Sequence, residues 1–368
     1  MHIVQAAAFP FPSMQGSQVY VHGIARALVS LGHRVTVVCY GHNQGEVSPG
    51  IEVVRVPRLF NYDRLRAGPD WVKPILDIGL AVRLSQLRPD VVHVHNYEAP
   101  MAELIAQFRR RVPMVYSAHN LMVDELEMYF DSPFYRFVAR LAGRVLDRTI
   151  PRMADAVVAI RPETVASLQE LGCSNVHCVM PGVNPSEFES VSAAHLPSGP
   201  WIVYAGNPDN YQELDVLYDA LQELPSDVGL LFITSAHSIQ LSELGQRKHL
   251  LIKTSSFKEV CSYIKAADVA VLPRSICSGF PIKLLNYLAL AVPTVVATGG
   301  APEIPGLHWF RAQDSVSLRQ TLERVLVDAN APQTAAHLRD HVFANQNWKQ
   351  QASLLERIYM DLLRSHSE

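Results

Sequence analysis

Short apolar segments alternate with helical patterns along almost the whole chain, and this alternation restricts the fold more than any other feature of the sequence. The segments are four to seven residues long and nearly continuously apolar, as expected for parallel strands that helices cover on both faces. Repeated strand–helix–strand units of this kind build doubly wound α/β sheets. In the first half of the chain, the predicted strands are 2–7, 34–40, 53–56, 91–95, 114–117, 156–160 and 176–180.

The second half repeats this order of elements, and the two halves are separated by a linker-like stretch. Helical patterns in the first half include 18–31, 72–87 and 162–171, and the strands expected in the second half are 201–205, 229–234, 250–253, 269–272 and 294–297. Residues 181–200 are rich in Pro, Gly and Ser and low in large apolar residues. We therefore predict one α/β domain at 1–184 and a second at 185–345, followed by a terminal amphipathic helix within 346–368.

Length and composition exclude several other classes of protein. The 368 residues fit two domains better than one, and 48% hydrophobic residues exclude a disordered chain. The net charge of −3 provides no general attraction for nucleic acid. The five cysteines form no CxxC pair, which suits a reducing compartment. We see no targeting segment and no apolar run long enough to span a bilayer, so we expect a cytoplasmic protein.

Two loops carry the residues best suited to bind an anion. Gly16 lies just before the first helix, where backbone N–H groups and the helix N-terminus favour a phosphate. A glycine in this position by itself indicates only a turn, and the loop is neither a dinucleotide-binding nor a Walker motif. The second loop follows the strand at 269–272 and carries Arg274 and Ser278. We expect Ser278 to cap a helix that begins near Pro281 and places Lys283 in its first turn.

The segment around this second loop resembles the signature of the family-4 retaining glycosyltransferases of GT-B fold. The resemblance rests on Gly279-Phe280-Pro281 and Lys283-Leu284-Leu285, and the segments 31–35, 90–95, 154–159 and 179–184 are similar to other parts of the family's sequences. It covers essentially the whole chain. It implies two Rossmann-like domains that face a cleft, with the acceptor in the first domain and a nucleotide sugar in the second. It also implies that the terminal helix crosses back onto the first domain.

The sequence departs from the family at the residues that hold the donor. The family's two glutamates fall on Ser278 and Asn286, and the Arg and Lys that grip the donor diphosphate fall on Asn207 and Gln212. Two lost cations weaken the binding of a diphosphate, because its charge must be offset.

We hypothesise that other residues compensate for these losses. Arg274 and Lys283 would supply the missing positive charge, with Gly16, Ser278 and Gly279 close to the diphosphate. The Asn286 amide would hydrogen-bond the ribose, since it both donates and accepts. The loop 255–257, with Phe257, would flank the base.

The resemblance also assigns residues to the sugar and to the acceptor. His119 follows a strand, where the family carries a histidine that contacts the donor sugar, so we expect it to orient that sugar. A lone histidine at a strand end is otherwise more often structural. Candidates on the acceptor side are Tyr97, Glu98, Asn120 and Glu125, for which a solvated loop is the simpler interpretation.

A metal site is the weaker interpretation of the histidines at 93 and 95. These residues alternate on a predicted strand and point to one face, but no third ligand has an obvious spacing. The resemblance implies no metal requirement, and no cofactor beyond the nucleotide-sugar co-substrate.

A row of arginines lies on one predicted helix. Arg136, Arg140, Arg144 and Arg148, continued by Arg152, are spaced by four and are interleaved with aromatic and aliphatic residues. This face would suit anionic lipid headgroups at the inner side of the cytoplasmic membrane, where lipid-linked acceptors reside. An ordinary solvated helix face remains the alternative.

The sequence as a whole favours a retaining glycosyltransferase that moves a sugar from a nucleoside-diphosphate donor to a hydroxyl acceptor. By analogy with the family, the acceptor belongs to cell-envelope polysaccharide or glycolipid assembly. Two alternatives stay open. One is a non-hydrolysing sugar-nucleotide epimerase, which would need acid and base carboxylates. The other is a catalytically silent GT-B protein that binds a partner.

Overall fold

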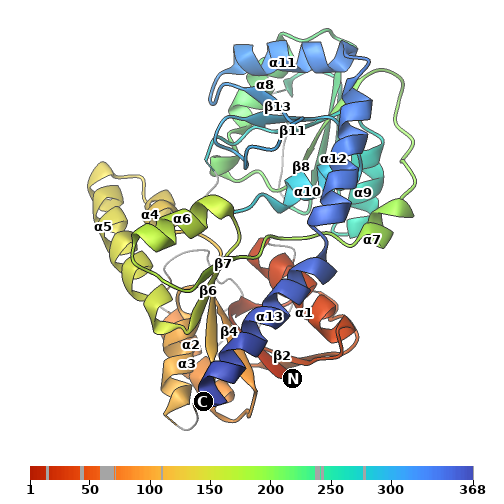
Figure 1. The fold of residues 1–368 in the computed structure, drawn as a ribbon. Coiled ribbons are helices and arrows are strands. Elements are labelled where there is room, and N and C mark those ends of the chain that lie inside the picture. Colours follow the sequence, from red (N-terminus) through yellow and green to blue (C-terminus); the bar gives the residue numbers. More distant parts are fainter. Residues whose placement is uncertain are drawn as a thin grey trace. The chain divides into compact units, whose positions relative to one another are not determined.

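The computed structural model describes residues 1–13, 16–41, 45–58, 70, 72–108, 111–236, 241, 244–276 and 279–367. The chain divides into two compact units (Figure 1). The first unit contains Met1–Gly182, Ser278–Phe280 and Trp348–Glu368, and the second contains Val183–Cys277 and Pro281–Asn347.

The first unit is built on a seven-stranded parallel sheet. Its strand order is β3-β2-β1-β4-β5-β6-β7. The strands are β1 (His2–Pro10), β2 (Arg34–Tyr40), β3 (Ile51–Arg55), β4 (Val91–His95), β5 (Met114–Ala118), β6 (Ala156–Ala159) and β7 (Val176–Cys178). β1, β4 and β5 are buried along nearly their whole length, which explains why their sequences are continuously apolar.

Helices cover both faces of this sheet. They are α1 (Gly16–Ser30), α2 (Lys73–Ser85), α3 (Ala99–Gln107), α4 (Met122–Glu125), α5 (Pro133–Thr149), α6 (Pro162–Glu170) and α13 (Trp348–Ser367), with 3₁₀ turns η1 (Leu126–Tyr129) and η2 (Pro151–Met153). The buried residues of α2 and α3 form one core with alternate residues of β1 and β4. The terminal helix α13 packs on α1, where a Cβ on Gly23 would lie 2.2 Å from the Trp348 ring. Glycine is therefore required for this close approach of the two helices.

The second unit contains a six-stranded parallel sheet of order β10-β9-β8-β11-β12-β13. The strands are β8 (Trp201–Ala205), β9 (Gly229–Thr234), β10 (His249–Lys253), β11 (Val269–Leu272), β12 (Thr294–Ala297) and β13 (His308–Phe310). The helices are α7 (Pro185–Glu189), α8 (Leu214–Gln222), α9 (Phe257–Lys265), α10 (Ile282–Ala289), α11 (Ser315–Val327) and α12 (Ala331–Asn345), with a 3₁₀ turn η3 (Asn210–Gln212). The two parallel sheets confirm the predicted doubly wound α/β class.

The structure corrects three local predictions. α10 begins at Ile282, and its N-cap is Pro281, which has an extended conformation. The predicted cap at Ser278 is therefore wrong. Ser278 itself lies outside the described residues. Residues 255–257 are not a free loop, because Ser256 caps α9 and Phe257 is its first residue. Arg152 does not continue the arginine row, because α5 ends at Thr149 and the Arg152 guanidinium donates to the Leu171 carbonyl at 2.5 Å.

Within the described part of the chain, no helix combines the length and apolarity needed to cross a bilayer.

Candidate functional site

Lys283 lies at the carboxyl edge of the second sheet and is held by two partners. Its ammonium donates to Gln212 Oε1 at 2.9 Å and to the Tyr204 hydroxyl at 3.1 Å. The ammonium also lies 4.4 Å from the centroid of the Tyr204 ring. These residues come from the first turn of α10, the end of η3 and the end of β8. The carboxyl ends of parallel strands and the N-termini of the following helices are where α/β folds bind anions.

Gly206 leaves the space that the Lys283 ammonium needs. A Cβ on Gly206 would lie 2.6 Å from Lys283 Nζ, closer than nonbonded atoms approach. The Tyr204 hydroxyl continues the chain of contacts, because it donates to the Asn207 carbonyl at 3.0 Å. The predicted donor residues Lys283, Gln212 and Asn207 are thus brought together by Tyr204, which the sequence analysis did not single out.

Asn207 and Gln212 differ in what their side chains do. The Asn207 amide oxygen accepts hydrogen bonds from the Thr234 and Ser235 hydroxyls, each at 3.3 Å, so it is tied to the end of β9. Gln212 is buried and uses its amide oxygen on Lys283. The sequence resemblance predicted Gln212 at the position of a family lysine, and in the structure Gln212 accepts a hydrogen bond from a lysine of another element.

Arg274 lies in a loop that the neighbouring Ser275 ties to the Glu213 carboxylate. Glu213, in the left-handed region with φ 52°, accepts from the Ser275 N–H at 2.9 Å and from its hydroxyl at 2.5 Å. A Cβ on Gly300 would lie 2.1 Å from the Arg274 carbonyl oxygen, so glycine allows the next loop to approach this one. Burial raises the pKa of the Tyr204 hydroxyl, and the nearby Arg274 charge partly opposes that rise.

The remaining predicted donor residues are less closely associated with Lys283. Asn286 is half-buried, three residues further along α10. The Phe257 ring is half-buried and packs edge-on against Phe188, with 5.6 Å between ring centroids. Its contact with the base therefore stays a prediction.

Two further predicted residues belong to the first unit. Gly16 is exposed as the first residue of α1. The Gly279 carbonyl accepts a hydrogen bond from Arg161 Nη1 at 3.3 Å, within the part of the chain that groups with the first unit.

His119 ends a chain of three buried histidines. The His119 Nε2 and His95 Nδ1 atoms are 3.1 Å apart, and the His93 and His95 rings lie 4.4 Å apart between centroids. His93 contacts the Tyr359 hydroxyl of α13 and the Ser117 hydroxyl of β5, both at 2.7 Å. The prediction that His93 and His95 point to one face is confirmed.

Burial keeps these histidines neutral. Desolvation lowers the pKa of His119 to about 4 and that of His93 to about 3, and the pKa of His95 lies well below its ordinary value for the same reason. His119 is therefore uncharged at neutral pH, where it can form hydrogen bonds but carries no positive charge.

The geometry also favours one tautomer of His119. His95 Nε2 is buried and has no hydrogen-bond partner among the described residues. An unpartnered N–H there would bury a donor without an acceptor, so we infer that the His95 proton is on Nδ1 and is donated to His119 Nε2. His119 then carries its own proton on Nδ1, where it can donate a hydrogen bond.

Three of the four predicted acceptor residues form polar pairs: Glu98 pairs with Lys73, and Asn120 pairs with Glu125. Glu98 Oε1 accepts from Lys73 Nζ at 3.2 Å, and both side chains are largely buried. Tyr97, half-buried beside Glu98, has a raised pKa because burial disfavours the phenolate. The Asn120 amide donates to Glu125 Oε2 at 2.7 Å. Of these residues, Tyr97 and Glu98 follow β4 and Asn120 follows β5, at the carboxyl edge of the first sheet.

Tyr129 is a further member of this region. Its hydroxyl donates to Glu125 Oε1 at 2.8 Å, so both Glu125 oxygens are used. Neither Lys73 nor Tyr129 was predicted, since nothing in their local sequence marks them and only the fold brings them to the strand ends.

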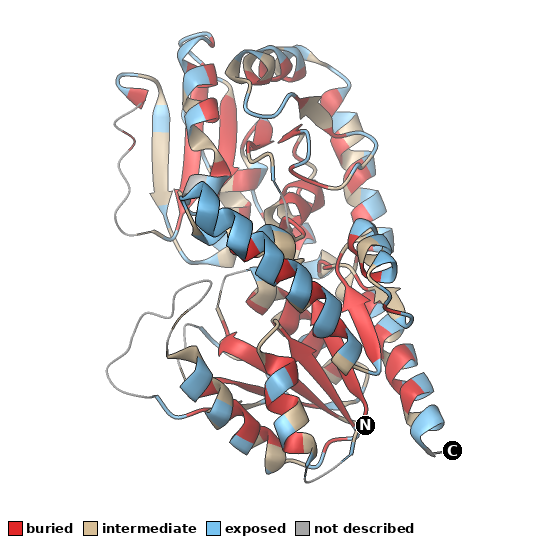
Figure 2. Ribbon diagram, turned by 90° about the vertical axis from the view of Figure 1, so that its left-hand side faces the viewer, coloured by how far each residue is buried: buried red, intermediate tan, exposed pale blue. Residues whose placement is uncertain are grey.

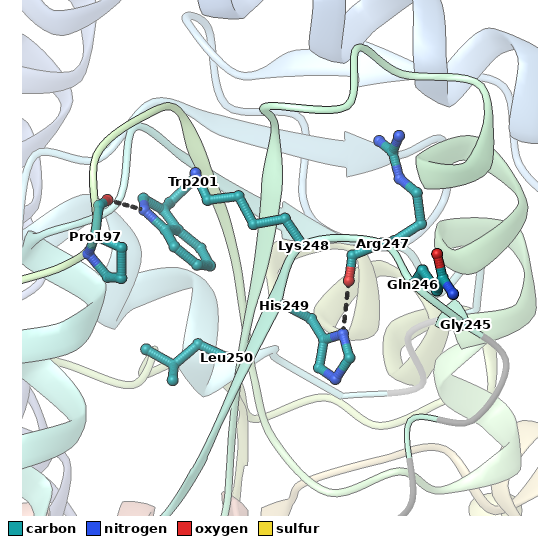
Figure 3. Close-up of a pocket in the computed structure, with 8 residues that line it drawn as sticks. All are labelled: Pro197, Trp201, Gly245, Gln246, Arg247, Lys248, His249 and Leu250. Atoms are coloured by element: carbon teal, nitrogen blue, oxygen red, sulfur yellow. Dashed lines mark hydrogen bonds between the residues drawn. The ribbon is translucent and has the colours of Figure 1, made fainter.

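Neither a metal centre nor the pocket at the amino edge of the second sheet offers a better site. Among the residues that the structure describes, no group of three or more His, Cys, Asp and Glu side chains is arranged to hold a metal ion. An open pocket lies at the amino edge of the second sheet and is lined by Trp201 and Lys248 among others (Figure 3). The Lys248 ammonium lies 4.3 Å from the Trp201 ring centroid and donates to the Ser198 and Asp227 carbonyls. That edge is opposite to the one at which α/β sheets bind ligands.

Comparison with known proteins places the chain in a family. A model described as "Glycosyl transferase 4-like domain" matches residues 15–182, and one described as "Glycosyl transferases group 1" matches residues 199–328. A D-inositol 3-phosphate glycosyltransferase from Xylanimonas cellulosilytica is 26% identical, over 77% of this chain and 76% of that one. A glycogen synthase from Mycobacterium tuberculosis is 24% identical, over 95% and 92% of the two chains.

Solved structures have the same fold at low sequence identity. Sucrose-phosphate synthase from Thermosynechococcus elongatus superposes with a TM-score of 0.83 at 17% identity, over 99% of this chain and 100% of that one. HepE from Anabaena in complex with UDP-glucose has a TM-score of 0.70 at 14% identity, over 97% and 99% of the chains. Together the two family models cover more than half of the sequence. The chain belongs to the group 1 glycosyltransferases of GT-B fold.

Proposed function

We propose that this protein transfers a sugar from a nucleoside-diphosphate donor to an acceptor hydroxyl with retention of the anomeric configuration. The bond between the anomeric carbon and the diphosphate oxygen breaks, and the acceptor oxygen bonds to the same face of that carbon. The acceptor's proton leaves with the diphosphate. The observation that carries the proposal is the Lys283 ammonium, oriented by Gln212 and Tyr204 at the carboxyl edge of the second sheet.

The Lys283 ammonium suits a diphosphate because two sources of positive potential meet there. It supplies a fixed positive charge, and it lies in the first turn of α10, where the helix dipole adds positive potential. The structures of HepE, which has the same fold, contain UDP or UDP-glucose, and this supports nucleotide binding by this chain. Arg274 would add charge from its loop, and Asn286 would contact the ribose.

His119 would orient the sugar. Its neutral imidazole would donate from Nδ1 to a sugar hydroxyl, with the tautomer set by His95. Retaining transfer depends more on positioning and charge stabilisation than on a strong base, which fits a histidine held neutral by burial.

We propose a polysaccharide or glycolipid acceptor of the cell envelope, held by the first unit near Glu98 and Glu125. The arginines of α5 would keep the protein at the inner face of the cytoplasmic membrane, where such acceptors are anchored. We expect neither a metal nor a resident cofactor to be required.

The direct test is product analysis. The protein is incubated with the α-linked glucose donors UDP-, GDP-, ADP- and dTDP-glucose, each with D-inositol 3-phosphate or a membrane lipid extract, and the products are followed by proton NMR. An α-linked product supports the proposal, and a β-linked product contradicts retention. An isomerised sugar nucleotide formed without acceptor would instead favour the epimerase alternative.

Matched lysine variants show whether the proposed site is responsible. Lys283→Met should abolish most of the transfer, whereas Lys258→Met, an exposed lysine of α9 in the same unit, should not. Absence of turnover with every donor, together with a stable complex with a second transferase, would favour the silent binding protein.

A further inference from the structure

Helix α5 turns its large apolar residues toward solvent. Phe134 is 69% exposed, Phe137 66% and Leu141 57%, and Val138 and Val145 are exposed as well. At about 100° per residue, positions 134, 138, 141 and 145 fall within one narrow stripe along the helix. In Figure 2, which faces the side of the first unit that carries α5, this helix is coloured mostly as exposed. An amphipathic helix of a globular protein normally turns such a stripe inward.

The opposite face of α5 is fixed against the protein by small and polar residues. A Cβ on Gly143 would lie 2.5 Å from the Met122 carbonyl oxygen, so only glycine fits there. The buried Asp147 carboxylate accepts from the Met122 N–H at 2.7 Å and from the Val123 N–H at 2.9 Å. The helix therefore cannot rotate its apolar stripe inward without losing these contacts.

Arginines approach the apolar stripe from one side of α5. By the same spacing of 100° per residue, Arg144 and Arg148 lie next to the stripe, and Arg136 and Arg140 lie further round the helix. These four arginines occupy successive turns of α5, whose one acidic residue is the buried Asp147. Arg144 and Arg148 are exposed and make no hydrogen bond or ion pair with other described residues. An exposed apolar stripe beside a row of cations is the pattern of helices that lie in the interface of an anionic bilayer.

Two further helices on the same side of the unit carry uncovered apolar residues. α2 exposes Ile75, Ile78 and Val82, although its other face is buried through Leu76 and Leu80. α3 exposes Met101 and Ile105, and Phe108, which directly follows the helix, is 93% exposed. Helices that are apolar all round are normally covered on all sides. Figure 1 shows α2, α3 and α5 along one side of the first unit.

We propose that α5, supported by α2 and α3, docks the protein on a membrane surface rich in anionic lipid. The apolar stripe of α5 enters the headgroup region and the arginines pair with lipid phosphates. The charge of the helix selects a negatively charged lipid surface over an apolar protein partner. The proposal extends the arginine contact given above by adding apolar insertion, and it is tested without donor or acceptor, so its outcome is independent of the transfer activity.

The test is sedimentation of the full chain with vesicles of phosphatidylcholine, with or without phosphatidylglycerol. We expect binding only to the anionic vesicles and weaker binding as salt is raised. Arg144→Gln with Arg148→Gln should weaken binding on the order of 30-fold. Phe134→Ser with Phe137→Ser should weaken it about tenfold or more.

Matched variants control for charge and for apolar surface. Arg357→Gln with Arg364→Gln changes the charge equally on α13, and Val316→Ser with Val327→Ser removes exposed apolar residues of α11. Both control proteins should bind like the wild type. All the replaced residues are exposed, so thermal unfolding should change little.

Three results would overturn the proposal. In the first, the wild-type protein does not sediment with anionic vesicles. In the second, the α5 variants bind the vesicles as well as the wild type does. In the third, no vesicle binding is seen and the protein forms a dimer that the Phe134→Ser and Phe137→Ser changes dissociate. The last result would assign the surface to a second copy of the chain.

Discussion

Replacing Lys283 with methionine tests the proposed phosphate site, because methionine keeps most of the volume and removes the charge. The ammonium is held by Gln212 and Tyr204 and is half-buried, so it needs little reorganisation to meet a ligand anion. One unit charge about 4 Å from another contributes about 4 kcal/mol at an effective dielectric constant of about 20. Part of this is offset by the loss of hydration. We therefore expect the variant to bind a nucleoside diphosphate about 2–4 kcal/mol more weakly, or roughly 30- to 1,000-fold.

Isothermal titration calorimetry measures this difference directly. The titration uses the nucleoside diphosphate that stabilises the wild type most, and the corresponding nucleoside serves as a ligand without phosphate. Lys283→Met should weaken binding of the diphosphate and leave the affinity for the nucleoside nearly unchanged. Lys258→Met should alter neither affinity. A folded Lys283→Met protein with wild-type affinity for the diphosphate would refute the reasoning.

Three further predictions concern the folded first unit. Burial lowers the pKa of His119 to about 4 and of His93 to about 3, so below pH 6.5 the unfolded chain binds protons that the folded protein does not. These two histidines alone should then lower the free energy of unfolding by up to about 2.7 kcal/mol per pH unit from pH 6.5 toward pH 4, and His95, whose pKa is also lowered, should add to this fall. A Tm that stays flat from pH 7 to 5 would contradict this. Gly23→Ala should cost about 1–3 kcal/mol in urea unfolding, because the added methyl group meets the Trp348 ring; unchanged stability would argue against this packing. Asp147→Ala should lower the free energy of unfolding by about 2–3 kcal/mol and Asp147→Asn by less, since the amide keeps one acceptor oxygen. Equal losses would contradict a stabilising contribution from the hydrogen bonds with the Met122 and Val123 N–H groups.

Much of the fold was predictable from local sequence. Strands buried on both faces leave continuous apolar segments, and for that reason 34–40, 91–95, 201–205 and 269–272 were predicted with the bounds that the structure has. The strand β13 was missed because His308, Trp309 and Phe310 are too few to form a pattern. The cap of α10 was misplaced because Pro281 adopts an extended conformation and delays the first helical turn.

The site was predictable only in part, because its contacts join distant parts of the chain. Lys283 was singled out, but its partner Gln212 lies 71 positions away and was expected to face the donor. His119 was predicted as well, whereas its link through His95 and His93 to Tyr359 of α13 spans most of the sequence. The residue types at such contacts carry no local signal, since the fold alone decides which of them meet.

The measurement that tests the central claim most directly is a thermal-shift panel of UDP, GDP, CDP, dTDP and ADP on the wild-type protein. A ligand at 100 times its Kd stabilises the folded state by roughly 2.7 kcal/mol, which is readily seen as a rise in Tm. We predict that one of these diphosphates raises the Tm and that its monophosphate does so much less. If no diphosphate raises the Tm, the protein does not hold a nucleotide at Lys283 and the proposed transfer is wrong.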